Sequence, residues 1–293
     1  MEGGGSKFRI SHIYKEQNQK IYMSIEYGKI LKKSFGFAFN PKRWLPFFAL
    51  DIVFISIIML FVLANLSTFV ALMVTMNTEP FVVGSFAAEI AVIVVIGAVW
   101  LLLRLWLIGA AVRQSHKEKE LGGSYDFALK KYPSLFAVTV IVAVVTCILS
   151  AIPYIGWLFA IIASLVFFFV VQSVIVGGNN FSNALMDSWS IFKKRPVHVL
   201  SVWIIIIILS LAIIAIFAIP MVVMMWGELA PNIMYLSDPS VLAGLLFFLF
   251  TNLHVLIIGG VILLAGEAII IALTLKIQTE FYIKLRKKKL GIF

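Results

Sequence analysis

The sequence predicts an all-α, polytopic integral membrane protein with six transmembrane helices. Its 293 residues are 62% hydrophobic and only 13% charged, against about half and about a quarter in typical soluble domains. The mean hydropathy is +1.05. Several apolar runs exceed the ~20 residues that a helix needs to cross a bilayer. We therefore expect a multi-pass protein of a cell membrane, with lipid around most of the chain.

The chain divides into one membrane domain and two tails. Residues 1–20 contain "GGGS" and scattered polar side chains, which predicts a flexible cytoplasmic tail. Residues 21–285 form the predicted six-span membrane domain, and residues 284–293 form a basic cytoplasmic tail.

Six apolar runs are predicted to span the membrane: about 45–76, 82–112, 134–152, 154–176, 198–226 and 241–275. Between the third and fourth runs lies only "AIPYIGW", where Pro153 and Gly156 predict a tight hairpin. The last run contains Gly259 and Gly260. From its sequence it is one long tilted helix, two spans, or an interfacial helix followed by a span.

The distribution of positive charge selects the six-span topology. Lys and Arg number nine before Leu45, five within 113–131, three within 193–195 and six within 276–289, which accounts for 23 of the 24. Only Arg104 lies inside a span. With six spans, all four groups lie on one side, and positive loops stay cytoplasmic. We therefore predict that both termini are cytoplasmic.

One polar stretch interrupts the apolar runs. In "NFSNALMDSWSIF", residues 180–192, the helical spacing predicts an amphipathic helix that lies on the cytoplasmic surface and leads into the fifth span. Asn180 is a plausible N-cap and Pro196 ends or bends the helix. Its apolar face comprises Phe181, Ala184, Leu185 and Trp189.

The same pattern occurs twice earlier in the chain. A shift of 154 residues aligns that face with Tyr27, Ile30, Leu31 and Phe35, and a shift of 56 aligns it with Tyr125, Ala128 and Leu129. Pro133 arrives early and shortens the middle copy. The chain is thus predicted to hold three parallel repeats, about 21–113, 123–177 and 180–276, each an amphipathic helix followed by a two-span hairpin. The alternative is that any helix entering a membrane from the cytoplasm acquires Lys, Pro and aromatic residues.

The pattern "ALMDSWSIFKKRP" before a long apolar hairpin, repeated in a six-span chain, resembles a known membrane domain. This domain is attached to some glycerophosphoryl diester phosphodiesterases and is similar to stand-alone six-span families of uncharacterised bacterial and archaeal proteins. The resemblance covers about residues 20–285, and its loose motif carries no catalytic residue. The phosphodiesterase domain is absent from this sequence. The resemblance therefore implies a membrane module rather than that enzyme.

Four charged residues fall at membrane depth, where they are functional candidates by default: Asp51, Glu89, Arg104 and Glu267. With the first hairpin turn near 77–79, Asp51 and Arg104 lie at one depth. Arg104 and Glu267 are each nine residues inside the cytoplasmic edge. The sequence therefore predicts one arginine facing two acids, with either a structural pairing role or a role in ligand or ion passage.

A second polar layer is predicted toward the outer side of the membrane. Antiparallel register places Asn65 level with Glu89, and the count outward from Lys276 places Asn252 and His254 at a similar height. This layer depends on a straight final helix, and a glycine such as Gly259 is a position at which a helix can bend.

Reactive groups are sparse, so we predict no catalytic site, no metal site and no cofactor. The four histidines, His12, His116, His198 and His254, have no paired metal spacing. Positive charge is membrane-proximal, which argues against a nucleic-acid partner and for contact with anionic lipid headgroups at the cytoplasmic face.

Three functions compete on this basis. The leading hypothesis is a non-enzymatic module that binds lipid or a hydrophobic ligand, or that scaffolds a membrane protein partner. The alternative is a small transporter or channel whose path is lined by Asp51, Arg104 and Glu267. An enzyme acting on lipid, with Glu89 and His254 as base and acid, ranks third.

Overall fold

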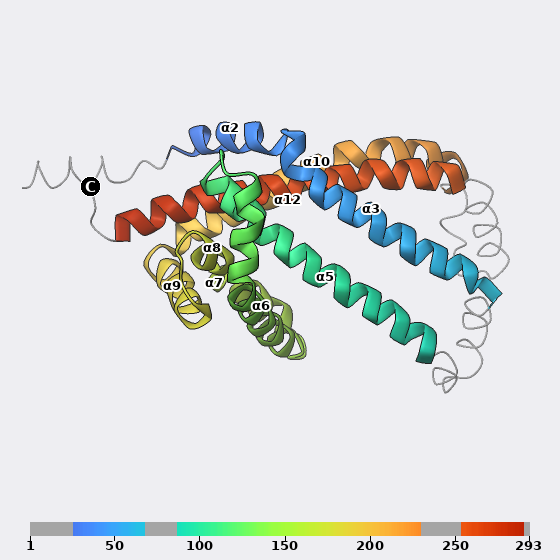
Figure 1. Ribbon diagram of the computed structural model, residues 1–293. Coiled ribbons are helices and arrows are strands. Elements are labelled where there is room, and N and C mark those ends of the chain that lie inside the picture. The colour runs from blue at the N-terminus through green and yellow to red at the C-terminus, as the bar shows by residue number, and fades with distance from the viewer. Residues whose placement is uncertain (1–25, 68–86, 230–252, 290–293) are drawn as a thin grey trace, which may run out of the picture.

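The computed structural model describes residues 26–67, 87–229 and 253–289, and within these ranges the chain forms helices and no strand (Figure 1). Six of these helical segments are long and apolar enough to cross a membrane: 41–64, 87–116, 122–150, 156–175, 196–223 and 253–286. The prediction of an all-α chain with six spans is confirmed. The threefold repeat and the orientation of the termini stay predictions. The predictions that concern 1–20, 77–79, Asn252 and 290–293 lie outside the described residues.

Nine helices lie within the described ranges. In chain order they are α2 (Tyr27–Ala38), α3 (Pro41–Ala64), α5 (Ala87–His116), α6 (Gly122–Ser150), α7 (Gly156–Val166), α8 (Val170–Ile175), α9 (Phe181–Lys194), α10 (Pro196–Leu229) and α12 (Leu253–Lys289).

The starts of α9, α10 and α3 follow from side-chain chemistry. The Asn180 side chain accepts a hydrogen bond from the Asn183 backbone N–H (3.0 Å), so the predicted N-cap of α9 is confirmed. Pro196 is the first residue of α10, directly after α9, as its fixed φ favours. Asn40 does the same for α3, accepting from the Lys42 N–H (3.1 Å) ahead of Pro41.

α12 is the central element of the assembly. It packs against α2, α3, α5 and α10, while α5 packs on α6, α6 on α7 and α8 on α9. Its second half is deeply buried: Ala268, Ala272, Ile277, Phe281 and Tyr282 are all fully enclosed. Figure 1 shows α3 and α12 close together near α2 and spreading apart away from it. The tightest packing is therefore at one end of the molecule.

The third and fourth spans form the predicted tight hairpin. α6 ends at Ser150 and α7 begins at Gly156. A Cβ on Gly156 would lie 2.3 Å from the Ser150 carbonyl oxygen, so only glycine allows this approach. Tyr154 takes a positive φ of 66° inside the turn.

The fourth span is not continuous, because the helix breaks between α7 and α8. Freed backbone groups in a membrane need new partners, and Ser188 of α9 supplies them. Its buried hydroxyl donates to the Val166 carbonyl oxygen (2.7 Å) and accepts from the Phe169 N–H (3.2 Å). A side chain of α9 thus supplies partners for backbone groups at the break in the fourth candidate span.

Helix α6 continues through a proline, and helix α12 continues through two glycines. Pro133 does not end the middle amphipathic segment, because α6 runs from Gly122 to Ser150 with Pro133 inside it. Proline removes one backbone hydrogen bond, and the fully buried Leu135 and Val138 beyond it anchor the helix in the core. The last run is one long helix from Leu253 through both glycines, within the described residues.

Candidate functional site

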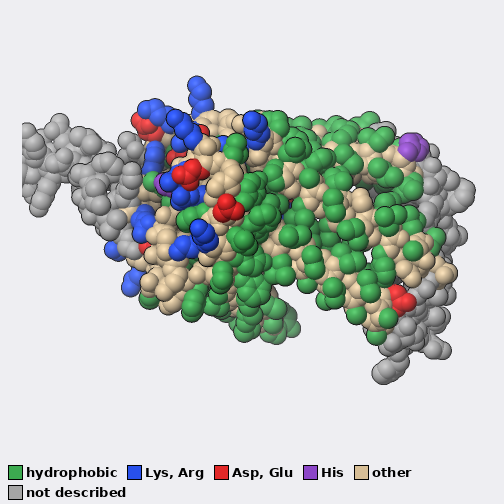
Figure 2. All heavy atoms as spheres, in the orientation of Figure 1, with side chains coloured by type: hydrophobic (Ala, Val, Ile, Leu, Met, Phe, Trp, Pro, Cys, Tyr) green, Lys and Arg blue, Asp and Glu red, His purple; other side chains and the backbone are tan. Residues whose placement is uncertain are grey.

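Lys and Arg side chains gather at one end of the molecule, and hydrophobic side chains cover the rest of the visible face (Figure 2). At this end α3 begins and α5 and α12 end. The gathering is the arrangement that the cytoplasmic-side prediction requires. Which side of a membrane this end occupies stays a prediction.

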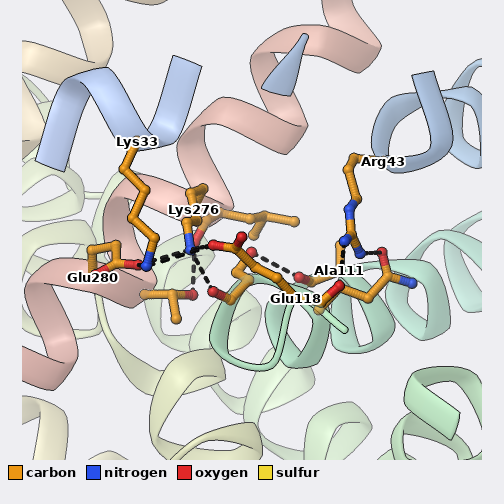
Figure 3. Close-up of polar contacts among 10 residues, drawn as sticks. Lys33, Arg43, Ala111, Glu118, Lys276 and Glu280 are labelled. Atoms are coloured by element: carbon orange, nitrogen blue, oxygen red, sulfur yellow. Dashed lines mark hydrogen bonds and ion pairs between the residues drawn. The ribbon is translucent and has the colours of Figure 1, made fainter. Parts of the chain in front are cut away.

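A charged cluster ties four segments together at this end, and its members are Lys33, Arg43, Glu118, Lys276 and Glu280, here named the basic-end cluster (Figure 3). Lys276 is fully buried. Its ammonium group lies 2.7 Å from a carboxylate oxygen of both Glu118 and Glu280, and it donates to the Ser115 carbonyl oxygen (2.6 Å). Lys276 thereby fixes the turn after α5 against α12.

Lys33 and Arg43 extend this cluster to α2 and α3. The Lys33 ammonium lies 2.8 Å from Glu280 and 3.5 Å from Glu118. The Arg43 guanidinium donates to the Gln114 side-chain oxygen (3.1 Å) and to the Glu118 carbonyl oxygen (2.6 Å). Every buried polar atom of the basic-end cluster has a partner within the described part of the chain. A buried polar network whose hydrogen bonds are all formed can hold the helices in one arrangement.

Charge pairing shifts the pKa of two members outside the spans. Partial burial by itself raises the pKa of the Glu118 carboxyl, but Lys276 and Lys33 outweigh it and hold that pKa below its ordinary value of 4.5. The hydrogen bond to Glu280 raises the pKa of Lys33 above 10.5. Both groups are therefore charged at neutral pH.

A recurring polar pair marks the basic end of the second, fourth and sixth spans, and it comprises Gln114–Ser115, Gln172–Ser173 and Gln278–Thr279. All six side chains are buried except Gln278, which is half-buried. Gln172 donates to Gln278 (2.9 Å), and Gln114 donates to the Ser124 hydroxyl (2.8 Å). Sequence reasoning missed this recurrence. Comparing the ends of alternate apolar runs would have shown it.

The predicted repeat faces are only partly enclosed by protein. Ile30, Ala128 and Ala184 occupy the same repeat position and are all buried. Leu129, Phe181 and Trp189 are exposed, with Leu129 at 63%. The remaining face residues are half-buried: Tyr27, Leu31, Phe35, Tyr125 and Leu185. Each face therefore packs on the protein through one edge and leaves the other edge open to its surroundings.

The charged residues at membrane depth do come together. Arg104 forms an ion pair with Glu267 and lies 3.7 Å from the Asp51 carboxylate. The Trp100 indole N–H donates to the same Asp51 oxygen (2.8 Å), and the Arg104 guanidinium lies 4.6 Å above the Trp100 ring. We name these four residues the intramembrane cluster. Sequence reasoning missed Trp100, although it lies one helical turn before Arg104.

This intramembrane cluster is neither balanced nor enclosed. It contains two acids and one base, hence a net charge of −1 when all three are ionised. Asp51 is only 3% exposed, and its Oδ2 atom has no hydrogen-bond partner in the described residues. The Glu267 side chain, in contrast, is 47% exposed.

Beside Glu267 lies a cavity of about 690 Å³ between α3 and α12, named the α3–α12 cavity. Ile55 and Met59 line it from α3, and Leu256 and Val261 line it from α12. Among the described lining residues, Glu267 is the only charged one. The predicted pairing of charges thus lies at the border of an apolar chamber, which the sequence did not indicate.

The predicted outer polar layer is not joined by hydrogen bonds within the described residues. The Asn65 side chain donates to the Phe61 carbonyl oxygen of its own helix (2.9 Å). His254 is exposed, and the buried Glu89 Oε2 atom has no hydrogen-bond partner among the described residues.

The described ranges hold no group of three or more His, Cys, Asp or Glu side chains arranged to bind a metal ion. A scan against protein-family models, a search of curated proteins and a search of solved structures found no match to this chain.

Proposed function

We propose that this protein is a non-enzymatic membrane module that binds a lipid or another hydrophobic ligand in the α3–α12 cavity. The observation that carries the proposal is the cavity itself. Its volume of about 690 Å³ lies within the ~300–1,000 Å³ of typical small-molecule sites. Such sites combine a mainly apolar lining with a few polar groups, and here Glu267 and Ser56 are the polar ones.

The shape of the lining supports an elongated ligand. Along α12 the lining residues run from Leu253 to Glu267, which is ~21 Å of helix. The apolar side chains occupy most of this length and the carboxylate stands at one end. An alkyl chain lying along α12 would place a polar head at Glu267.

The basic end supports a membrane-surface role for the same module. Lys29, Lys32, Lys193 and Lys194 are exposed there, and we propose that they contact anionic headgroups of the cytoplasmic leaflet. We also propose that the chain shares its architecture with the phosphodiesterase-associated membrane domain that its sequence resembles. A membrane protein partner that uses the same surface belongs to the same proposal.

Transport is the second candidate, and the paired Asp51, Arg104 and Glu267 at one depth favour it. Liposome flux assays separate the two functions. Flux of protons or ions through wild-type protein, abolished in Arg104→Gln protein of normal folding, supports transport. Retained ligand without flux supports a binding module.

Native mass spectrometry of the gently extracted protein tests the binding proposal. Gly260 lines the cavity, and a Cβ there would meet no atom within 4 Å, so Gly260→Phe fills the cavity without a backbone clash. Gly97 of α5 has equally open surroundings outside the cavity, and Gly97→Phe is the matched control.

We expect wild-type and Gly97→Phe protein to retain a lipid or small molecule at fixed stoichiometry, and Gly260→Phe protein to lose it. Equal retention by all three proteins contradicts the assignment of the cavity. A bare wild-type protein contradicts the binding function.

A further inference from the structure

We propose that the α3–α12 cavity selects an amphiphile with a cationic ammonium head, which pairs with Glu267 while its apolar chain fills the cavity. This inference rests on the proposed function and deepens it, because it names the chemical class of the ligand.

The first argument is charge balance. Asp51 and Glu267 share the single counter-charge of Arg104, so the intramembrane cluster has a net charge of −1 when ionised. An uncompensated charge at membrane depth is expensive. A cationic head supplies the missing charge, whereas an anionic head raises the excess to two.

The second argument is the state of Arg104. Its guanidinium contacts both carboxylates and stacks on the Trp100 ring (4.6 Å). An anionic head would have to compete with two acids for this arginine. Arg104 is therefore held as a fixed partner of the acids and is a poor receptor for a phosphate or a carboxylate.

The third argument is access. Arg104 contacts Glu267 through Oε1, yet 47% of the Glu267 side chain stays exposed and this residue lines the cavity. Asp51 is 3% exposed, and its Oδ2 atom has no partner in the described part of the chain. The buried Asp51 thus adds unsatisfied negative charge next to the accessible Glu267. An ammonium group offers three N–H donors to such a site.

The experiment compares probes that share one chain and differ in the head. Dodecylamine, dodecanol and dodecyl phosphate are titrated by calorimetry into protein in phosphatidylcholine nanodiscs, with protein-free nanodiscs as the baseline for partitioning. The variants are Glu267→Gln, which keeps the shape, and Glu267→Asp, which keeps the charge. Glu89→Gln removes another acid of the membrane region, which does not line the cavity.

We expect wild-type and Glu89→Gln protein to bind dodecylamine about tenfold or more tightly than dodecanol, in the range of a charge-assisted hydrogen bond. Glu267→Gln protein should bind both equally, with its affinity for dodecanol unchanged. Glu267→Asp protein should regain part of the preference for the amine, which a purely structural role of Glu267 does not explain.

The opposite results are distinct. Equal binding of the three heads by wild-type protein, or a preference for the amine that persists in Glu267→Gln protein, overturns the inference and leaves the binding function standing. Binding no greater than in protein-free nanodiscs for every probe overturns both. Should Glu267→Gln protein fail to fold, the head preference of wild-type and Glu267→Asp protein decides the matter.

Discussion

The basic-end cluster and the intramembrane cluster are both built from acids and bases of distant helices, but they differ in completion. In the basic-end cluster, each buried polar atom has a partner within the described part of the chain, and the Lys276 ammonium group is fully enclosed. Around Arg104, one acid oxygen has no partner in the described residues, a second acid is half-exposed, and a cavity adjoins it. Completed networks fix a fold. Incomplete ones beside a cavity are where a ligand has something to add.

The largest effect is expected from Lys276→Met. This change leaves Glu118 and Glu280 without their central partner and removes the bond to the Ser115 carbonyl oxygen. Breaking a buried ion pair costs about 3 kcal/mol or more. Thermal unfolding in detergent should show a strongly lowered midpoint or a loss of folded protein. Lys29→Met is the control, because the Lys29–Glu26 pair is exposed and such pairs contribute little. Equal unfolding midpoints for the two variants would contradict a stabilising role of the basic-end cluster.

Glycine substitutions test whether the two regions differ in packing. A Cβ at Gly177 would lie 2.4 Å from the Ser173 carbonyl oxygen and 2.5 Å from the Tyr282 hydroxyl, whereas Gly260 has open space. We expect Gly177→Ala to destabilise by about 1–3 kcal/mol, the usual cost of overpacking. Gly260→Ala should cost nothing, because alanine favours helix more than glycine does. Unfolding midpoints of both variants in one detergent check this, and a loss at Gly260 would mean that the cavity is packed shut.

Removal of the Asp51 carboxylate, the more buried acid of the intramembrane cluster, tests whether net charge governs ligand selection. Asp51→Asn keeps the acceptor oxygen for Trp100 and removes the excess negative charge. Dodecylamine binding should weaken about tenfold, or ~1.4 kcal/mol, although Asp51 does not line the cavity. Calorimetry with dodecanol as the neutral reference separates this from a general loss of the site. Unchanged amine affinity would show that net charge does not govern selection.

The smallest effect is the pH dependence of the basic-end cluster. Because the pKa of Glu118 is lowered in the folded protein, its ion pairs stabilise the fold above the ordinary carboxyl pKa of 4.5 and are lost as pH falls through the folded value. Because the pKa of Lys33 is raised, its contribution is complete below 10.5 and is lost as pH rises through the folded value. The unfolding midpoint of wild-type protein should therefore fall at both extremes. Glu118→Gln protein should show a smaller fall of the unfolding midpoint at low pH. An unaltered fall would mean that other groups cause the loss of stability in acid.

The sequence predicted the features that depend only on a residue's depth along the membrane normal. Counting residues from a turn or from a charged edge placed Asp51, Arg104 and Glu267 at one level, and the structure brings them into contact. Hydrophobicity and positive charge similarly predicted six spans. These quantities vary along one axis, and a linear sequence encodes them directly.

What the sequence did not predict depends on rotation and separation of helices. Lys276 served in the sequence analysis as a positive charge and as a depth reference, yet it is the buried centre of the basic-end cluster. The α3–α12 cavity exists because two helices that touch at one end spread apart toward the other (Figure 1). Pro133 was predicted to shorten the middle amphipathic segment, yet α6 continues through it. Each of these follows from neighbours that are distant in sequence.

The most direct test of the contrast between the two clusters is thermal unfolding of wild-type and Glu267→Gln protein in phosphatidylcholine nanodiscs, with and without dodecylamine. Glutamine retains an acceptor for Arg104, and Asp51 retains the counter-charge, so we predict nearly equal midpoints without ligand. At ~100-fold excess over Kd, ligand should stabilise wild-type protein by about 2.7 kcal/mol and leave the variant almost unmoved. A variant that melts far lower without ligand, or that gains as much from dodecylamine as wild-type protein does, would contradict a ligand site at Glu267.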